Sequence, residues 1–326
     1  MEHKTCPSRF PFQDLQALIT NPLLLDERFP TFAGRTVSSA WQRTMHDRSV
    51  TLLEQLVHDP SPLLDWVAHR PSHRLGYYFE QLFLFWLSHL GPITSLHGHR
   101  PVVENHRTLG ELDILGFDQD TGEGFHFELA IKFYLQVAKD RVEPCDFVGP
   151  KAQDRLDIKL DRLFQKQLRL LETEAGRRAI PRELQNVPIL SQAFVQGGLF
   201  YPLEVWLGSE APRVPAGLMS TAPIGWWIRM DQVPPRDWSQ LPADQWSDLP
   251  RLEWLSRQNR DRDDPDLQDA EHFWDISRRK IQETGRAILA VGYVRAGAHG
   301  GWLEVTRGFL LPETWPQTMA TDRDKS

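Results

Sequence analysis

The segment that most restricts how this chain can fold is Gly124–Leu135, which reads GFHFELAIKFYL. Alternate residues of a β-strand point to opposite faces of a sheet. One face of this segment then carries only apolar side chains, namely Phe127, Leu129, Ile131 and Phe133. The other face carries Glu128, Ala130 and Lys132. Because the apolar face must belong to a core, the segment predicts a strand that holds charged residues within a packed sheet.

A second strand, residues 110–117, is predicted just before it and reads GELDILGF. Glu111 and Asp113 lie on one face of this strand. The turn-forming sequence DQDTGE separates the two strands and predicts a β-hairpin. If the loop has an even number of residues, Asp113 lies opposite Glu128 or Ala130. All the acids then share one face.

These acids predict a metal site. Residues paired directly across two strands have Cβ atoms about 5 Å apart. Two carboxylates so close, without bases directly opposite, must share a proton or a cation. Burial of unpaired charges is costly, and a hard divalent cation such as Mg²⁺ prefers oxygen ligands. The alternative is a solvated strand face on which the charges have no function.

Helices and strands alternate around this hairpin. The strongest helix signal, residues 73–90, reads HRLGYYFEQLFLFWLSHL and is apolar almost all round, as in a helix buried in a core. Glu80 lies in its middle, and Gly91-Pro92 ends it. Further helices are predicted around residues 14–25, 49–58 and 151–174, and strands around 101–105, 192–207, 224–230, 286–294 and 302–311. Residues 73–207 therefore follow the order α-β-β-β-α-β, which predicts an α/β protein with a mixed central sheet.

We expect three regions in the 326 residues. Residues 1–70 form a helical extension, 71–210 form the core, and 211–326 form an α/β part rich in Trp and Pro that packs on the core. Most of the twelve tryptophans lie in the last region, where we expect them to pack in the interior rather than to stack on bases.

Composition excludes several classes of protein. No run of about 18 apolar residues predicts a membrane span, and the first residues lack the apolar stretch of an export signal. Two cysteines give neither a disulfide framework nor a zinc spacing, so we expect a cytoplasmic protein. The net charge of −7 argues against coating nucleic acid by bulk charge, but it permits an enzyme with a local basic groove.

Three motifs resemble those of the PD-(D/E)XK nuclease superfamily. They are Gly76-Tyr-Tyr-Phe-Glu80, Gly110-Glu-Leu-Asp113 and Phe127-Glu-Leu-Ala-Ile-Lys132. The resemblance covers about residues 71–207 and implies a restriction-endonuclease-like core. The chain also resembles, over most of its length, a bacterial domain family of unknown function placed in that superfamily, whose late R-G-F strand corresponds to Arg307-Gly308-Phe309.

The resemblance implies a Mg²⁺- or Mn²⁺-dependent nuclease acting on DNA or RNA. Asp113, Glu128 and the backbone carbonyl of Leu129 would hold the metal, and Glu80 would bind a second metal or orient a metal-bound water. Lys132 would orient or activate that water. Glu111, Lys159 and Gln165 would be accessory residues.

The motif departs from the superfamily at one position. The usual lysine, two residues after the glutamate, is Ala130 here, and Lys132 comes two residues later. A second hypothesis follows, in which the nuclease fold has lost catalysis and serves as a binding or scaffolding module. The histidines His97, His99, His106 and His126 cluster in the sequence, but no third partner at a convincing spacing predicts a zinc site.

Overall fold

Two compact units make up the chain in the computed structural model, which describes residues 8–70, 72–138, 141–232, 240–297 and 300–316. The first unit comprises Met1–Ile131, Lys159–Gly197 and Gly217–Thr221. The second unit comprises Lys132–Ile158, Gly198–Ala216 and Ala222–Ser326. The three-region division at residues 70 and 210 stays a prediction.

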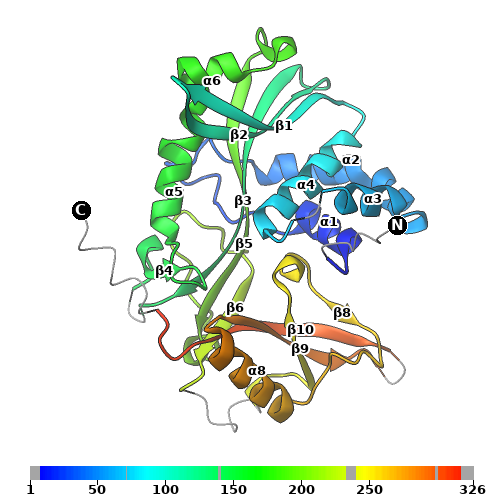
Figure 1. Cartoon of the computed structure of the whole chain (residues 1–326), viewed down its shortest axis with the longest axis vertical. Coiled ribbons are helices and arrows are strands. Elements are labelled where there is room, and N and C mark those ends of the chain that lie inside the picture. Colours follow the sequence, from blue (N-terminus) through cyan, green and yellow to red (C-terminus); the bar gives the residue numbers. More distant parts are fainter. Residues whose placement is uncertain (1–7, 71, 139–140, 233–239, 298–299, 317–326) are drawn as a thin grey trace. The chain divides into compact units, whose positions relative to one another are not determined.

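Helices and strands alternate through both units (Figure 1). The α-helices are α1 (Pro11–Thr20), α2 (Ser39–His58), α3 (Ser61–Ala68), α4 (Leu75–Ser88), α5 (Leu156–Gln165), α6 (Glu174–Ala179), α7 (Leu203–Trp206) and α8 (Ala270–Thr284). The strands are β1 (Ile93–Glu104), β2 (Arg107–Asp118), β3 (Glu123–Gln136), β4 (Phe147–Val148), β5 (Ile189–Pro202), β6 (Ile224–Arg229), β7 (Gln245–Leu249), β8 (Asn259–Arg260), β9 (Ile288–Arg295) and β10 (Trp302–Leu311). The predicted order α-β-β-β-α-β is present as α4, β1, β2, β3, α5 and β5, with the two-residue strand β4 before α5 and the short helix α6 after it.

The strands form a large mixed sheet. Hydrogen-bonded neighbours follow the order β1-β2-β3-β5-β6-β10-β9-β7, with β4 paired to β3 and β8 paired to β10. Strand β6 runs parallel to both β5 and β10, whereas β1, β2 and β3 pair antiparallel. The predicted α/β class with a mixed central sheet is confirmed. The restriction-endonuclease-like topology stays a prediction.

The hairpin of β2 and β3 forms as predicted. Its ladder runs from Asp118 opposite Glu123 to Ile114 opposite Phe127, which leaves an even-numbered loop at residues 119–122. Gly122 takes a positive φ of 71° in that loop, a conformation that glycine adopts without a steric penalty. Ile114 and Phe127 are the last paired residues, so Asp113 and Glu128 lie immediately beyond them, where the two strands begin to separate.

The core of the first unit packs α4 against the sheet. As expected for a helix that is apolar all round, α4 buries nine of its residues. The Phe83 ring lies 5.8 Å from that of Phe127 on β3 and 4.9 Å from that of Phe194 on β5, between ring centroids. In the view of Figure 1, helices α1 to α4 lie on one side of β3 and α5 lies on the other.

The single helix predicted over residues 151–174 is wrong. Helix α5 ends at Gln165, and a 3₁₀ helix, η2 (Gln167–Glu172), follows. Lys166 leaves the helical conformation, with φ −123° and ψ −63°. Long-range packing overrides the leucine periodicity here, because Leu170 fills the space beside Gly110, where an added Cβ would come within 2.8 Å of it.

The core of the second unit contains the predicted buried tryptophans. Trp226, Trp246 and Trp274 are almost fully buried. The R-G-F motif lies on β10 beside them. Gly308 pairs with Trp226 of β6 and with Ala290 of β9, and the Arg307 guanidinium binds Glu304 at 2.6 Å. Within the described residues this motif therefore has a packing role.

Candidate metal and catalytic site

Asp113 and Glu128 face each other at the end of the β2–β3 ladder. The Leu129 backbone N–H donates to Asp113 Oδ2 at 2.9 Å. The Glu128 carboxylate in turn accepts a hydrogen bond from the Asp113 backbone. Each carboxylate therefore contacts the backbone of the opposite strand. This arrangement brings together the two acids that the sequence predicted as metal ligands.

Hydrogen bonds fix the orientation of the fully buried Glu128 side chain. Gln167 Nε2 donates to Glu128 Oε2 at 2.7 Å, and Lys159 Nζ donates to Gln167 Oε1 at 3.1 Å. On the other side, His126 Nε2 lies 3.1 Å from Glu128 Oε1, and His126 Nδ1 lies 3.1 Å from Ser191 Oγ. The Glu128 carboxylate is thus part of a chain of hydrogen bonds that begins at an ammonium group.

His126 does not neutralise its carboxylate partner near neutral pH. Burial lowers the pKa of His126 to about 4, so the imidazole is uncharged there. In the sequence His126 clusters with three other histidines, and their spacing predicts no metal site. Its place on β3, two residues before Glu128, was the signal that put both side chains on one face.

Glu80 and Glu111 meet at a second histidine. His99 Nδ1 lies 2.9 Å from Glu111 Oε1 and 3.6 Å from Glu80 Oε2. Gln81 Nε2 lies 3.1 Å from the other imidazole nitrogen. The Glu80 side chain is 21% exposed and that of Glu111 is 47% exposed. Glu111 is therefore a residue at the rim of the site, whereas Glu80 lies deeper.

The carboxylates hold protons more tightly than ordinary acids. Burial, and then the charge of Asp113, raises the pKa of Glu80 to about 8. Burial, and then the charge of Glu128, raises the pKa of Asp113 to about 7. Burial also raises the pKa of Glu128 to about 8, although the Lys159 charge opposes this. The Lys159 charge therefore does not offset the burial of three acids, and a bound cation would supply further positive charge.

The donor set fits a small hard cation. Within the described ranges, no three His, Cys, Asp or Glu side chains are arranged to hold one metal ion. Mg²⁺ does not require three, because it commonly binds one or two carboxylates and completes its shell with water and substrate phosphate. Asp113 and Glu128 would supply the two carboxylates, and their role as ligands stays a prediction. The predicted roles of Leu129 and Glu80 as ligands stay predictions.

The predicted lysine and glutamine have other surroundings. Lys132 Nζ donates to Asp154 Oδ2 at 2.5 Å, and the Tyr134 hydroxyl donates to the same oxygen at 3.4 Å. Gln165, the predicted accessory glutamine, is exposed at the end of α5. Gln167 contacts Glu128 instead, because the break at Lys166 changes the direction of the chain between these two glutamines.

We expect the metal-free chain to lose stability as the pH rises. In the unfolded chain these acids titrate near pH 4. The folded chain keeps their protons up to about pH 7 for Asp113 and about pH 8 for Glu128. Between pH 5.5 and 8.5 the unfolded state therefore binds fewer protons, and the free energy of unfolding falls, by about 2 kcal/mol or more.

Urea denaturation at the two pH values, without divalent cations, measures this fall. Addition of Mn²⁺ or Mg²⁺ at pH 8.5 should restore the stability, because the cation replaces the lost protons. A free energy of unfolding that stays constant or rises over this range would contradict the buried-acid interpretation.

Comparison with known proteins places residues 13–311 within one family. The matching family model is described as "Domain of unknown function (DUF1853)". No curated protein and no solved structure shows significant similarity to the chain. Among the described helices, none has the length and apolar character needed to cross a membrane.

Proposed function

The chain belongs to the DUF1853 family of domains of unknown function, and we propose that its carboxylate site is that of a divalent-metal-dependent phosphodiester hydrolase acting on nucleic acid. One observation carries the proposal. Asp113 and Glu128 lie across from each other at the end of a ladder, Asp113 half-buried and Glu128 fully buried, without a Lys or Arg ion-pair partner among the described residues. The motif order and the element order, both similar to those of PD-(D/E)XK nucleases, support it.

Each residue of the site has a role in the proposed reaction. Asp113 and Glu128 would hold the cation, and the hydrogen bonds of Gln167 and His126 restrain the Glu128 carboxylate. When bound, the cation supplies Lewis-acid stabilisation of a phosphoryl oxygen and lowers the pKa of a bound water. Glu80 would bind a second metal or orient a metal-bound water.

Lys159 is the amine that we assign to the developing negative charge on the phosphate. Its ammonium lowers the pKa of both Glu80 and Glu128, so its charge acts on the site, and its hydrogen bond to Gln167 restrains it. A fixed positive charge stabilises a transition state in which negative charge develops. Lys132, the lysine predicted from the sequence, is ion-paired with Asp154.

The test is a cleavage assay on single- and double-stranded DNA and RNA with Mg²⁺ or Mn²⁺. We expect cleavage of at least one substrate and its loss in Asp113→Asn. The matched control is Glu123→Gln, an exposed acid of the same hairpin, which should cleave normally. Lys159→Met should lower the rate at least about tenfold, since it removes one electrostatic contact, and Lys132→Met should lower it less. The reverse order would assign the role to Lys132.

A second function is favoured by one observation. Ala130 occupies the usual lysine position, and Lys132 has an acidic partner of its own. A nuclease fold without catalysis would bind Mn²⁺ through Asp113 and Glu128 but cleave none of the substrates. Calorimetric titration with Mn²⁺, run beside the assay, separates the two. Binding without cleavage would support the binding module, and absence of both would contradict both functions.

A further inference from the structure

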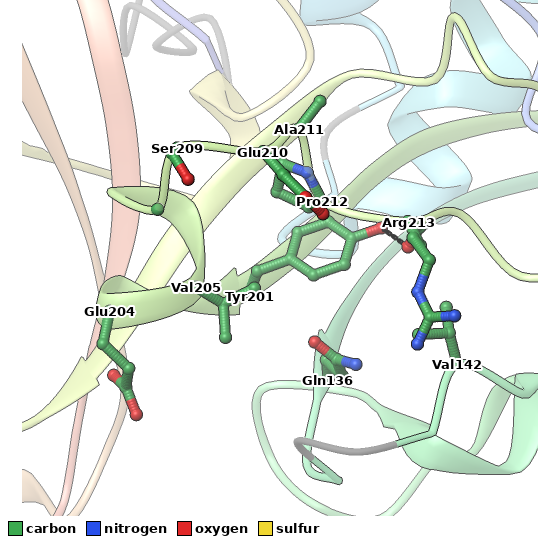
Figure 2. Close-up of a pocket in the computed structure, with 11 residues that line it drawn as sticks. Gln136, Val142, Tyr201, Glu204, Val205, Ser209, Glu210, Ala211, Pro212 and Arg213 are labelled. Carbon is green, nitrogen blue, oxygen red and sulfur yellow. Dashed lines mark hydrogen bonds between the residues drawn. The ribbon is translucent and has the colours of Figure 1, made fainter.

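The second unit has a cavity of its own. It has a volume of about 300 Å³ and is lined by Gln136, Val142, Tyr201, Val205, Pro212 and Arg213, with Glu204, Gly208, Ser209, Glu210 and Ala211 completing the wall. Figure 2 shows the lining side chains around the Tyr201 ring. Small-molecule pockets range from about 300 to 1,000 Å³. This cavity therefore suits a ligand with few heavy atoms.

An unsatisfied acceptor lies in its wall. Gln136 is 2% exposed, and its Oε1 atom has no hydrogen-bond partner among the described residues. The amide orientation is set by the other end of the group, since Gln136 Nε2 donates to the Arg141 carbonyl at 3.0 Å. A buried carbonyl without a partner costs about 1–3 kcal/mol. A ligand N–H that reached this oxygen would recover much of that free energy.

The positively charged Arg213 side chain lies at the rim of the same cavity. The Tyr201 hydroxyl donates to the backbone carbonyl of Arg213 at 2.9 Å, which anchors the loop that carries the arginine (Figure 2). The Arg213 side chain is exposed, and no carboxylate among the described residues lies within ion-pair distance of its guanidinium. A guanidinium in this situation can bind a carboxylate through two parallel hydrogen bonds.

The wall thus combines both signs of charge with apolar surface. Glu204 and Glu210 would repel a ligand that is only anionic, and Arg213 would repel one that is only cationic. A zwitterion carries one charge of each sign, so each of its charged groups can find an oppositely charged or polar partner in this wall. Its carboxylate would bind Arg213, and its ammonium would donate to Gln136 Oε1. Val142 and Val205 offer apolar contact to a hydrocarbon side chain.

We propose that this cavity binds a free α-amino acid with an aliphatic side chain. The Gln136 oxygen has almost no exposed surface in the ligand-free chain. Binding therefore requires the side chains that cover this oxygen to move aside. The site is separate from the proposed nuclease function, since all of its lining residues belong to the second unit.

The test is calorimetric titration of the full-length chain with L-leucine. Two analogues serve as controls: 4-methylpentanoate lacks the amine, and 3-methylbutan-1-amine lacks the carboxylate. We expect saturable binding of leucine with a Kd of about 1 mM or tighter. Each analogue should bind at least about tenfold more weakly, because each loses one charged hydrogen bond.

Variants locate the site. Arg213→Gln, at an exposed position that tolerates the change, should weaken leucine binding at least about tenfold. Arg286→Gln, an exposed arginine elsewhere in the second unit, should leave it unchanged. Three results would each overturn the proposal: no saturable binding signal up to 10 mM leucine, 4-methylpentanoate binding as tightly as leucine, or unchanged leucine affinity in Arg213→Gln. None of these outcomes depends on cleavage of nucleic acid.

Discussion

At pH 8.5 the Glu128→Gln variant is expected to unfold at a higher temperature than the wild-type chain, and to lose about a thousand-fold or more of its metal-dependent cleavage. The gain in stability follows from removing a buried acid whose pKa is raised to about 8. At this pH the wild-type residue is largely ionised within the core, whereas the amide is neutral. We expect an increase of about 1–2 kcal/mol in the free energy of unfolding, measured without divalent cations.

The amide can keep the two side-chain hydrogen bonds of the carboxylate. Its oxygen can accept from Gln167 Nε2, and its NH₂ group can donate to His126 Nε2 once the imidazole proton moves to the nitrogen facing Ser191. Loss of cleavage would then reflect loss of a metal ligand and not of structure. At pH 5.5 the stability difference should shrink, because the wild-type acid is protonated there.

Two results would contradict this account. A Glu128→Gln variant less stable than the wild type at pH 8.5 would mean that the carboxylate is compensated in the folded chain. A variant that cleaves at the wild-type rate would remove Glu128 from the metal site. Glu123→Gln again serves as the control, since its carboxylate is exposed and its replacement should change neither quantity.

The Gly308→Ala variant is expected to destabilise the chain by about 2–3 kcal/mol or more. A Cβ at this position would lie 2.1, 2.3 and 2.4 Å from three carbons of the Trp226 indole. That ring has no exposed surface, and its Nε1 donates to Thr306 Oγ1 at 2.8 Å. Neither partner can move easily, because Gly308 is paired on both sides, to β6 and to β9.

Thermal or urea unfolding of Gly308→Ala measures the cost. The matched control is Gly76→Ala, a glycine-to-alanine change on α4 where an added Cβ meets nothing within 4 Å. That change should stabilise the chain by about 0.5–1 kcal/mol, since alanine favours the helical state. If Gly308→Ala unfolds like the wild type, the packing explanation of the R-G-F motif is wrong.

Local patterns predicted the elements that carry the acids. Period-two alternation and the turn sequence predicted the β2–β3 hairpin, and apolar residues all round predicted α4 as a buried helix. These features depend on residues close in the sequence. The sequence left Asp113 opposite Glu128 or Ala130, and the observed register puts it beside Glu128.

The partners of those acids could not be predicted in the same way. Gln167 and Ser191 reach the Glu128–His126 pair from 39 and 65 residues away, through contacts that leave no periodic signal. The break at Lys166 is equally invisible, because the leucines of residues 151–174 fit one continuous helix. The salt bridge of Lys132 with Asp154 joins residues 22 positions apart, and no pattern in the sequence indicated it.

The route of the chain through its two units limits how the protein can be divided. The chain crosses from one unit to the other after residues 131, 158, 197, 216 and 221. No single cut therefore releases either unit whole, and a fragment ending at Ile131 would carry Asp113 and Glu128 without Lys159 or Gln167. Insertions and fusions that leave both units whole are therefore expected at the chain ends or in surface loops.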